Sequence, residues 1–141
     1  MVTMKWFLRE SLAAYLTAVQ SRVVLADGAE SIDEGCFAFG RVVAVGGGYR
    51  AHGAVRFVAH AGALDLLIAS PEILIDAGQA ALSTVNRAGK RTVVAKGATI
   101  GGTGSIAFDA ALTAMGSGVF GGAYPLHAVV GRFEVAGTVV P

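Results

Sequence analysis

The sequence predicts a mainly β fold, an antiparallel β-sandwich with an N-terminal α-helix packed on it. Near the N-terminus, apolar residues recur at helical spacing. Beyond Asp27-Gly28, short runs rich in Val, Ile and Phe are separated by glycine, as in antiparallel strands and hairpins. The 141 residues show no break in composition, so a single domain spanning residues 1–141 is expected.

A helix is predicted from about Lys5 to Gln20, with Thr3 as a candidate N-cap. Its apolar stripe contains residues separated by three or four positions: Leu8, Ser11, Leu12, Tyr15 and Val19. Ser11 and Tyr15 are one helical turn apart, so both hydroxyls are expected to project from the same face and to look inward.

The rest of the chain is predicted to form strands bounded by glycine or polar turn residues. The candidate strands are 22–25, 36–45, 49–59, 64–69, 72–76, 79–86, 91–98, 104–111 and one or two within 129–140. Such a density of short strands is typical of a sandwich or a barrel, and we predict the sandwich. The uncharged run 110–131 holds five glycines and Pro125, so it is predicted to form strands and turns rather than a membrane-spanning helix.

Composition and charge limit the kinds of ligand and partner that the chain is expected to bind. Hydrophobic residues make up 54% of the chain and charged residues 15%, which indicates an apolar ligand pocket or a buried interface such as that of a homodimer, with core packing as the plain alternative. The eleven basic residues are scattered and the net charge is +1, so nucleic acid is not an expected partner. The single cysteine, Cys36, permits neither an intrachain disulfide nor a cysteine-based metal cluster.

Two distant segments contain the candidate ligand-binding residues. Tyr15 ends the string Trp-Phe-Leu-Arg-Glu-Ser-Leu-Ala-Ala-Tyr at residues 6–15, and His60 lies in Gly-Ala-Val-Arg-Phe-Val-Ala-His-Ala-Gly-Ala-Leu-Asp at residues 53–65. By strand alternation, His60 is expected on the same face as Arg56 and Val58. From pattern alone, a tyrosine on an apolar helix face is more often a core residue, and a lone strand histidine is more often structural.

Together, the two strings resemble the HtaA domain, the haem-binding module of actinobacterial haem uptake, and they occur in the family's order. The resemblance implies that Tyr15 ligates the iron of a ferric haem b, that His60 donates a hydrogen bond to the Tyr15 oxygen, and that Ser11 hydrogen-bonds to a haem propionate. A phenolate suits ferric iron, and a donor beside it stabilises the iron–oxygen bond. With no second axial ligand recognised, five-coordinate iron is expected.

A shorter segment near the C-terminus adds one candidate. Phe-Gly-Gly-Ala-Tyr-Pro at residues 120–125 resembles the F-G-x-F-Y element near the end of HtaA domains. The resemblance implies that Tyr124 flanks the porphyrin or hydrogen-bonds to a propionate. An ordinary aromatic turn is the plain alternative.

The resulting prediction is a non-enzymatic haem-binding protein for haem uptake, transport or transfer, whose partners are haem and other haem carriers. Two alternatives stay open: a peroxidase-like haem enzyme, and an interaction module that has kept the fold without haem. The resemblance suggests a secreted or cell-surface protein. Arg9 and Glu10 interrupt the apolar N-terminal stretch, so no signal peptide is recognised, and a cytoplasmic location is expected if the chain is full length.

Overall fold

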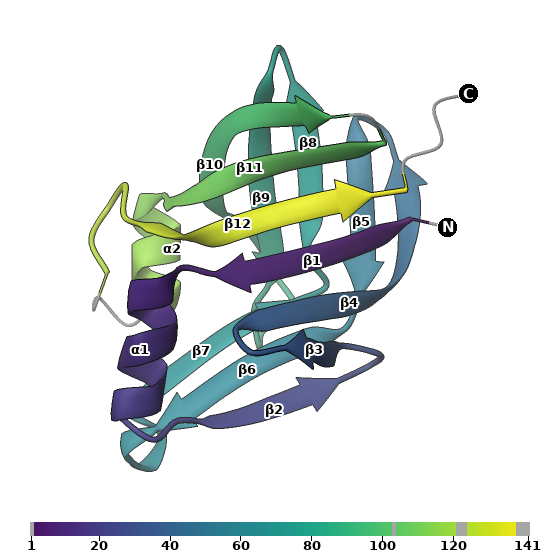
Figure 1. Ribbon diagram of the computed structural model, residues 1–141. Coiled ribbons are helices and arrows are strands. Elements are labelled where there is room, and N and C mark those ends of the chain that lie inside the picture. The colour runs from purple at the N-terminus through teal and green to yellow at the C-terminus, as the bar shows by residue number, and fades with distance from the viewer. Residues whose placement is uncertain (1, 103, 121–123, 138–141) are drawn as a thin grey trace.

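The computed structural model describes residues 2–102, 104–120 and 124–137. Strands dominate this part of the chain, and two short α-helices lie together at one side of the molecule (Figure 1). The predicted mainly β, antiparallel character is confirmed, since every strand pairing is antiparallel.

The N-terminal helix is shorter than predicted because the chain begins with a strand. Strand β1 spans Thr3–Leu8, and its buried residues, Met4 and Trp6, alternate with more exposed ones, which is the period of a strand. Helix α1 spans Glu10–Ala18 after Arg9, an N-cap in extended conformation whose side chain makes no capping bond, so the prediction of a helix from Lys5 capped by Thr3 is wrong.

The largest sheet closes on itself. Its strands are β4 (Cys36–Val45), β5 (Gly48–His52), β8 (Glu72–Asp76), β9 (Gln79–Val85), β10 (Arg91–Gly102), β11 (Ser105–Leu112) and β12 (Val129–Ala136), together with β1 and β3 (Glu30–Asp33). They follow the order β1-β12-β11-β10-β9-β8-β5-β4-β3, and β1 also pairs with β4. This second pairing closes eight strands into a barrel, in place of the predicted face-to-face sandwich, and leaves β3 outside on β4.

A second, three-stranded sheet carries the candidate histidine. It has the order β2-β6-β7, with β2 at Arg22–Ala26, β6 at Ala54–Ala59 and β7 at Leu64–Ala69. The predicted strand 49–59 is divided between the two sheets at Gly53, whose φ of +113° favours glycine. A short 3₁₀ turn, η1 (His60–Gly62), joins β6 to β7.

The run predicted to form only strands and turns contains a second helix. Helix α2 spans Ala114–Val119, and Thr113 caps it by accepting a hydrogen bond at 3.1 Å from the Gly116 backbone N–H. Gly116 lies against the Val94 carbonyl, where a side chain would collide, so the glycine that argued against a helix is what lets α2 pack on β10. In the described part of the chain, no helix is long and apolar enough to cross a membrane.

The core is built around Trp6. Its ring stacks on Phe133 at a centroid distance of 5.5 Å and meets the edge of Phe57 at 6.3 Å. Because Phe133 lies on β12 and Phe57 on β6, this contact joins the closed sheet to the small sheet. Helix α1 buries Leu12 and Leu16 against the same core.

Candidate functional site

Tyr15 and Tyr124 meet between α1 and the segment that follows α2. Their ring centroids are 6.3 Å apart and the rings meet edge to face, a favourable aromatic arrangement. Tyr15 is half-buried against the core, and no hydrogen bond of its hydroxyl is present among the described residues. The structure thus brings together two of the four predicted site residues and leaves the Tyr15 oxygen available to a ligand.

Tyr124 is held in place by α2. The Ser117 hydroxyl donates to the Tyr124 carbonyl at 2.7 Å, and Phe120 meets the Tyr124 ring edge to face at 6.2 Å. Burial raises the pKa of the Tyr124 phenol, the neighbouring Tyr15 raises it further, and Arg9 partly opposes the shift. Tyr124 therefore stays protonated at neutral pH and can donate a hydrogen bond. The predicted segment 120–125 is only partly visible here, since residues 121–123 lie outside the described residues.

Ser11 does not look inward as predicted. It lies on the first turn of α1, one turn before Tyr15, but it is exposed to solvent. The helix turns its buried stripe, Leu12 and Leu16, toward the core, so Ser11 and Tyr15 lie on one flank of that stripe rather than at its centre. Ser11 is accessible to a ligand that approaches this flank.

His60 lies past the end of β6, not on its face. Strand β6 ends at Ala59, and His60 begins the turn η1 in the left-handed region with φ +55°, followed by Ala61 at φ +54°. Two successive non-glycine residues in this region are costly, and such strain is concentrated at binding sites. His60 is exposed, and the structure shows no hydrogen bond between it and Tyr15 among the described residues.

The turn that carries His60 is fixed by an ion-pair cluster. Arg56 on β6 donates to Asp65 on β7 from Nε at 2.8 Å and from Nη2 at 2.7 Å, and Arg87 contacts the same carboxylate. Asp65 is the diagonal cross-strand neighbour of Arg56, a pairing that was not predicted from the sequence. The cluster ties together the two strands on either side of η1.

Asp65 should make stability depend on pH. Hydrogen bonds from Arg56 and Arg87 hold the pKa of the Asp65 carboxyl well below its usual range, although burial opposes this. Because the folded pKa lies below the unfolded value of about 3.9, the stabilisation is complete above that pH and is lost as the pH falls. The free energy of unfolding, measured with urea, should fall more between pH 7 and pH 3 in wild type than in Asp65→Asn.

The matched control for that experiment is Asp109→Asn. Asp109 also pairs with an arginine, Arg132, but both side chains are about half exposed, at 51% and 48%. Exposed pairs contribute little to stability. This variant should therefore keep the wild-type dependence on pH, and an Asp65→Asn protein that also kept it would contradict the assignment.

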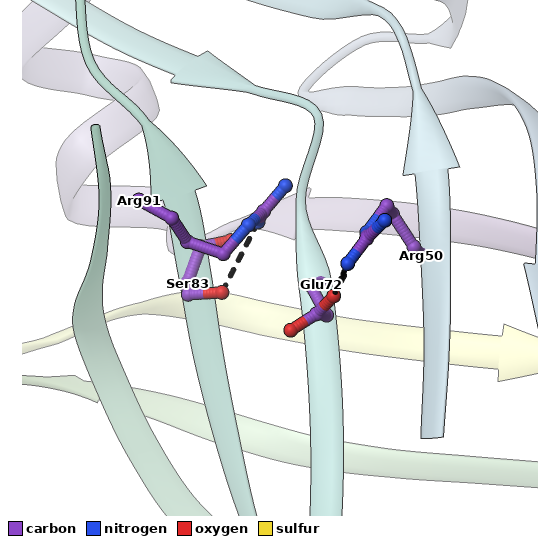
Figure 2. A network of polar contacts seen from close by, with 4 residues as sticks. All are labelled: Arg50, Glu72, Ser83 and Arg91. Atoms are coloured by element: carbon purple, nitrogen blue, oxygen red, sulfur yellow. Dashed lines mark hydrogen bonds and ion pairs between the residues drawn. The ribbon is translucent and has the colours of Figure 1, made fainter. Parts of the chain in front are cut away.

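A second polar cluster lies on the closed sheet. Figure 2 shows Arg50 donating from Nε to Glu72 at 2.8 Å and Arg91 donating to the Ser83 hydroxyl at 3.1 Å. Glu72 and Ser83 are buried, and burial lowers the pKa of Arg91. Buried polar groups need such partners, so we interpret this cluster as structural.

Within residues 2–102, 104–120 and 124–137, no three His, Cys, Asp or Glu side chains are grouped to hold a metal ion. A groove of about 380 Å³ between β7, the 86–90 turn and α2 is lined by other residues, including Asp65, Leu67 and Val119, and not by the four predicted site residues.

Exposed apolar residues occur in the segment that carries Tyr124. The two most exposed large hydrophobic residues of the described chain are Met115, at 59%, and Leu126, at 50%, and both belong to the segment around α2 that also carries Tyr124. Sequence reasoning missed these two residues, because periodicity cannot show which apolar residues stay at the surface. An aromatic pair with an available phenol, next in sequence to exposed apolar side chains, is a candidate ligand-binding site.

The chain belongs to the HtaA family, whose model (described as Htaa) matches residues 1–133. Membership of this family indicates that the chain is not an enzyme. No match was found among curated proteins.

Solved structures with the same fold come from Corynebacterium glutamicum. The heme binding protein HtaB superposes with a TM-score of 0.77 at 18% identity, covering 96% of this chain and 93% of that chain. The C-terminal domain of HtaA gives 0.73 at 20% identity, covering 95% and 93%. A domain-swapped dimer of a histidine-to-alanine variant of that domain gives 0.61 at 19% identity, covering 89% of each chain. At these identities, the likeness establishes the fold.

Proposed function

We propose that the chain is a single haem-binding domain that serves haem uptake, transport or transfer. Tyr15 is the proposed ligand of a ferric haem b, His60 its hydrogen-bond donor, Ser11 a propionate anchor and Tyr124 a residue that flanks the porphyrin. The observation that carries the proposal is the Tyr15 hydroxyl, which has no protein partner among the described residues and stands beside Tyr124 in a chain of the HtaA family.

The residues present suit a porphyrin. Its flat faces need apolar contact, which the exposed Met115 and Leu126 and the ring of Tyr124 offer. Its carboxylates need donors, and the exposed Ser11 on the first turn of α1 is one. A bound haem would supply iron as a Lewis acid, and the phenolate oxygen of Tyr15 would hold it.

His60 supports the ligand from a separate turn. Its imidazole is exposed and carries no hydrogen bond among the described residues, so a ring N–H is available to the phenolate. The left-handed backbone of η1 and the Arg56–Asp65 pair between the flanking strands fix the position of the turn that carries the ring. A residue that hydrogen-bonds to a metal-ligating side chain usually strengthens metal binding by about 10- to 100-fold.

Titration of the apoprotein with ferric haem, followed by absorption and by native mass spectrometry, tests the proposal. We expect saturation at one haem per chain and a phenolate-to-iron charge-transfer band. The absence of saturable binding would support the alternative of an interaction module without haem.

Ser11→Ala should weaken haem binding without changing the iron ligand. One lost hydrogen bond to a charged propionate corresponds to about 1.5–3 kcal/mol, or roughly a 10- to 100-fold higher dissociation constant. The charge-transfer band should stay unchanged. Thr17→Ala, also an exposed hydroxyl on α1 but on the opposite flank, is the matched control and should bind haem as wild type does.

A further inference from the structure

The fold removes or protects most of its strand edges. Closure through β1 leaves the eight-stranded barrel without a free edge. Strand β3 is an edge, but it has only four residues, begins with Glu30 and ends with Asp33, and its pairing with β4 shifts register between Ser31 and Asp33. Short length, charge and a bulge are the usual protections of an edge. In the small sheet, the edge strand β7 contacts both α2 and β9.

Strand β2 has fewer of these protections, since it has no bulge and its one charged residue, Arg22, lies at its end. It pairs with β6 along all five residues without a register shift, and its other edge has no partner strand in the described chain. Every residue of β2 is exposed, including Val23 at 42%, Val24 at 38% and Leu25 at 36%. In Figure 1, β2 lies at the lower margin of the molecule, with β6 on one side only. An exposed, regular, apolar edge is a template for another strand.

We propose that β2 pairs with β2 of a second copy of this chain, antiparallel across a twofold axis. Arg22 begins the strand and Asp27 follows its last residue. With Val24 on the twofold axis, antiparallel pairing sets each Arg22 opposite Ala26 of the partner subunit, one residue before the acidic Asp27, at both ends of the contact, whereas parallel pairing would bring like charges together. Val24 lies at the centre, near the twofold axis. This proposal places the self-association predicted from the high apolar fraction at β2.

This interface is independent of haem. It uses none of Ser11, Tyr15, His60 or Tyr124, so the apoprotein should dimerise. The two three-stranded sheets would join into one sheet of six strands. Failure of haem binding would leave the interface standing, and failure of dimerisation would leave the haem site standing.

Sedimentation velocity of the apoprotein over a range of concentrations tests the interface. We expect a monomer–dimer equilibrium in wild type. Val24→Lys places two lysines near the twofold axis and should raise the dissociation constant about 100-fold, since like charges across an interface are costly. The control is Leu74→Lys: Leu74 is 40% exposed, but β8 is paired on both sides, so its dimer should persist. Circular dichroism checks that both variants fold.

Exchange of the charges at Arg22 and Asp27 tests whether the partner of β2 is a second copy of this chain. Arg22→Glu alone and Asp27→Lys alone should each be monomeric, because each homodimer would bring like charges together at both ends. Mixed in equal amounts, the two variants should recover the dimer, since opposite charges then meet at both ends. A monomeric wild type at hundreds of micromolar, a Val24→Lys protein that folds and still dimerises, or a mixture that stays monomeric would each overturn the proposal.

Discussion

Tyr15→Phe should reduce the affinity for ferric haem by at least about 100-fold and remove the phenolate-to-iron charge-transfer band. The substitution deletes one oxygen and keeps the ring that packs edge-on against Tyr124. Because no hydrogen bond of the Tyr15 hydroxyl is present among the described residues, the fold should lose little stability. Haem titration, absorption spectra and thermal unfolding of the apoprotein measure the three quantities.

Two further tyrosine variants separate the ligand from its surroundings. Tyr124→Phe keeps the aromatic contact with Tyr15 and should keep the charge-transfer band. Tyr49→Phe, in a half-buried tyrosine on β5 of the closed sheet, should change neither affinity nor spectrum. His60→Ala should fall between Tyr15→Phe and wild type in affinity, as expected of a residue that acts through the ligand. An unchanged spectrum in Tyr15→Phe would mean that Tyr15 is only a packing residue.

Three strands were predicted with the correct bounds. Predicted strands 36–45, 64–69 and 72–76 agree with β4, β7 and β8 to the residue. Strand β1 was missed because Leu8 and the α1 residues that follow share helical spacing. The predicted helix therefore began too early, within the alternating segment that forms β1. Strand β3 was missed because Glu30 and Asp33 give it no apolar pattern. Closure of the sheet depends on β1, so the barrel could not be predicted while β1 was read as helix.

The candidate site was predictable in its residue types but not in its geometry. Spacing on one helix placed Ser11 and Tyr15 on one flank, and a local motif nominated Tyr124. No pattern in the sequence says that the segment after α2 packs against α1, since that contact joins residues more than a hundred positions apart. The place of His60 was predicted wrongly because strand alternation was extended one residue past Ala59, into a turn that the left-handed φ values create.

Trp6→Ala should cause the largest loss of stability. Trp6 is 0% exposed and contacts Phe37, Phe57 and Phe133. Removal of a buried tryptophan side chain typically costs about 3–5 kcal/mol, against a total stability of roughly 5–15 kcal/mol for a domain. Urea unfolding followed by circular dichroism measures the loss, because the variant lacks the chain's single tryptophan as a fluorescent probe. Val93→Ala, at an exposed apolar position on β10, is the control and should change stability little.

Trp6→Phe keeps this prediction testable if the alanine variant fails to fold. The indole Nε1 of Trp6 is buried and has no hydrogen-bond partner among the described residues, so phenylalanine removes an unsatisfied donor while it retains an aromatic ring. Its loss should be clearly smaller than that of Trp6→Ala, and equal losses would mean that the ring contacts with Phe57 and Phe133 do not dominate. Only Arg9 separates β1 from α1, so a loosened Trp6 also frees the helix that carries Tyr15. Haem affinity in Trp6→Phe should therefore fall by less than in Tyr15→Phe, with the charge-transfer band retained, because this substitution changes the position of the ligand and not its identity.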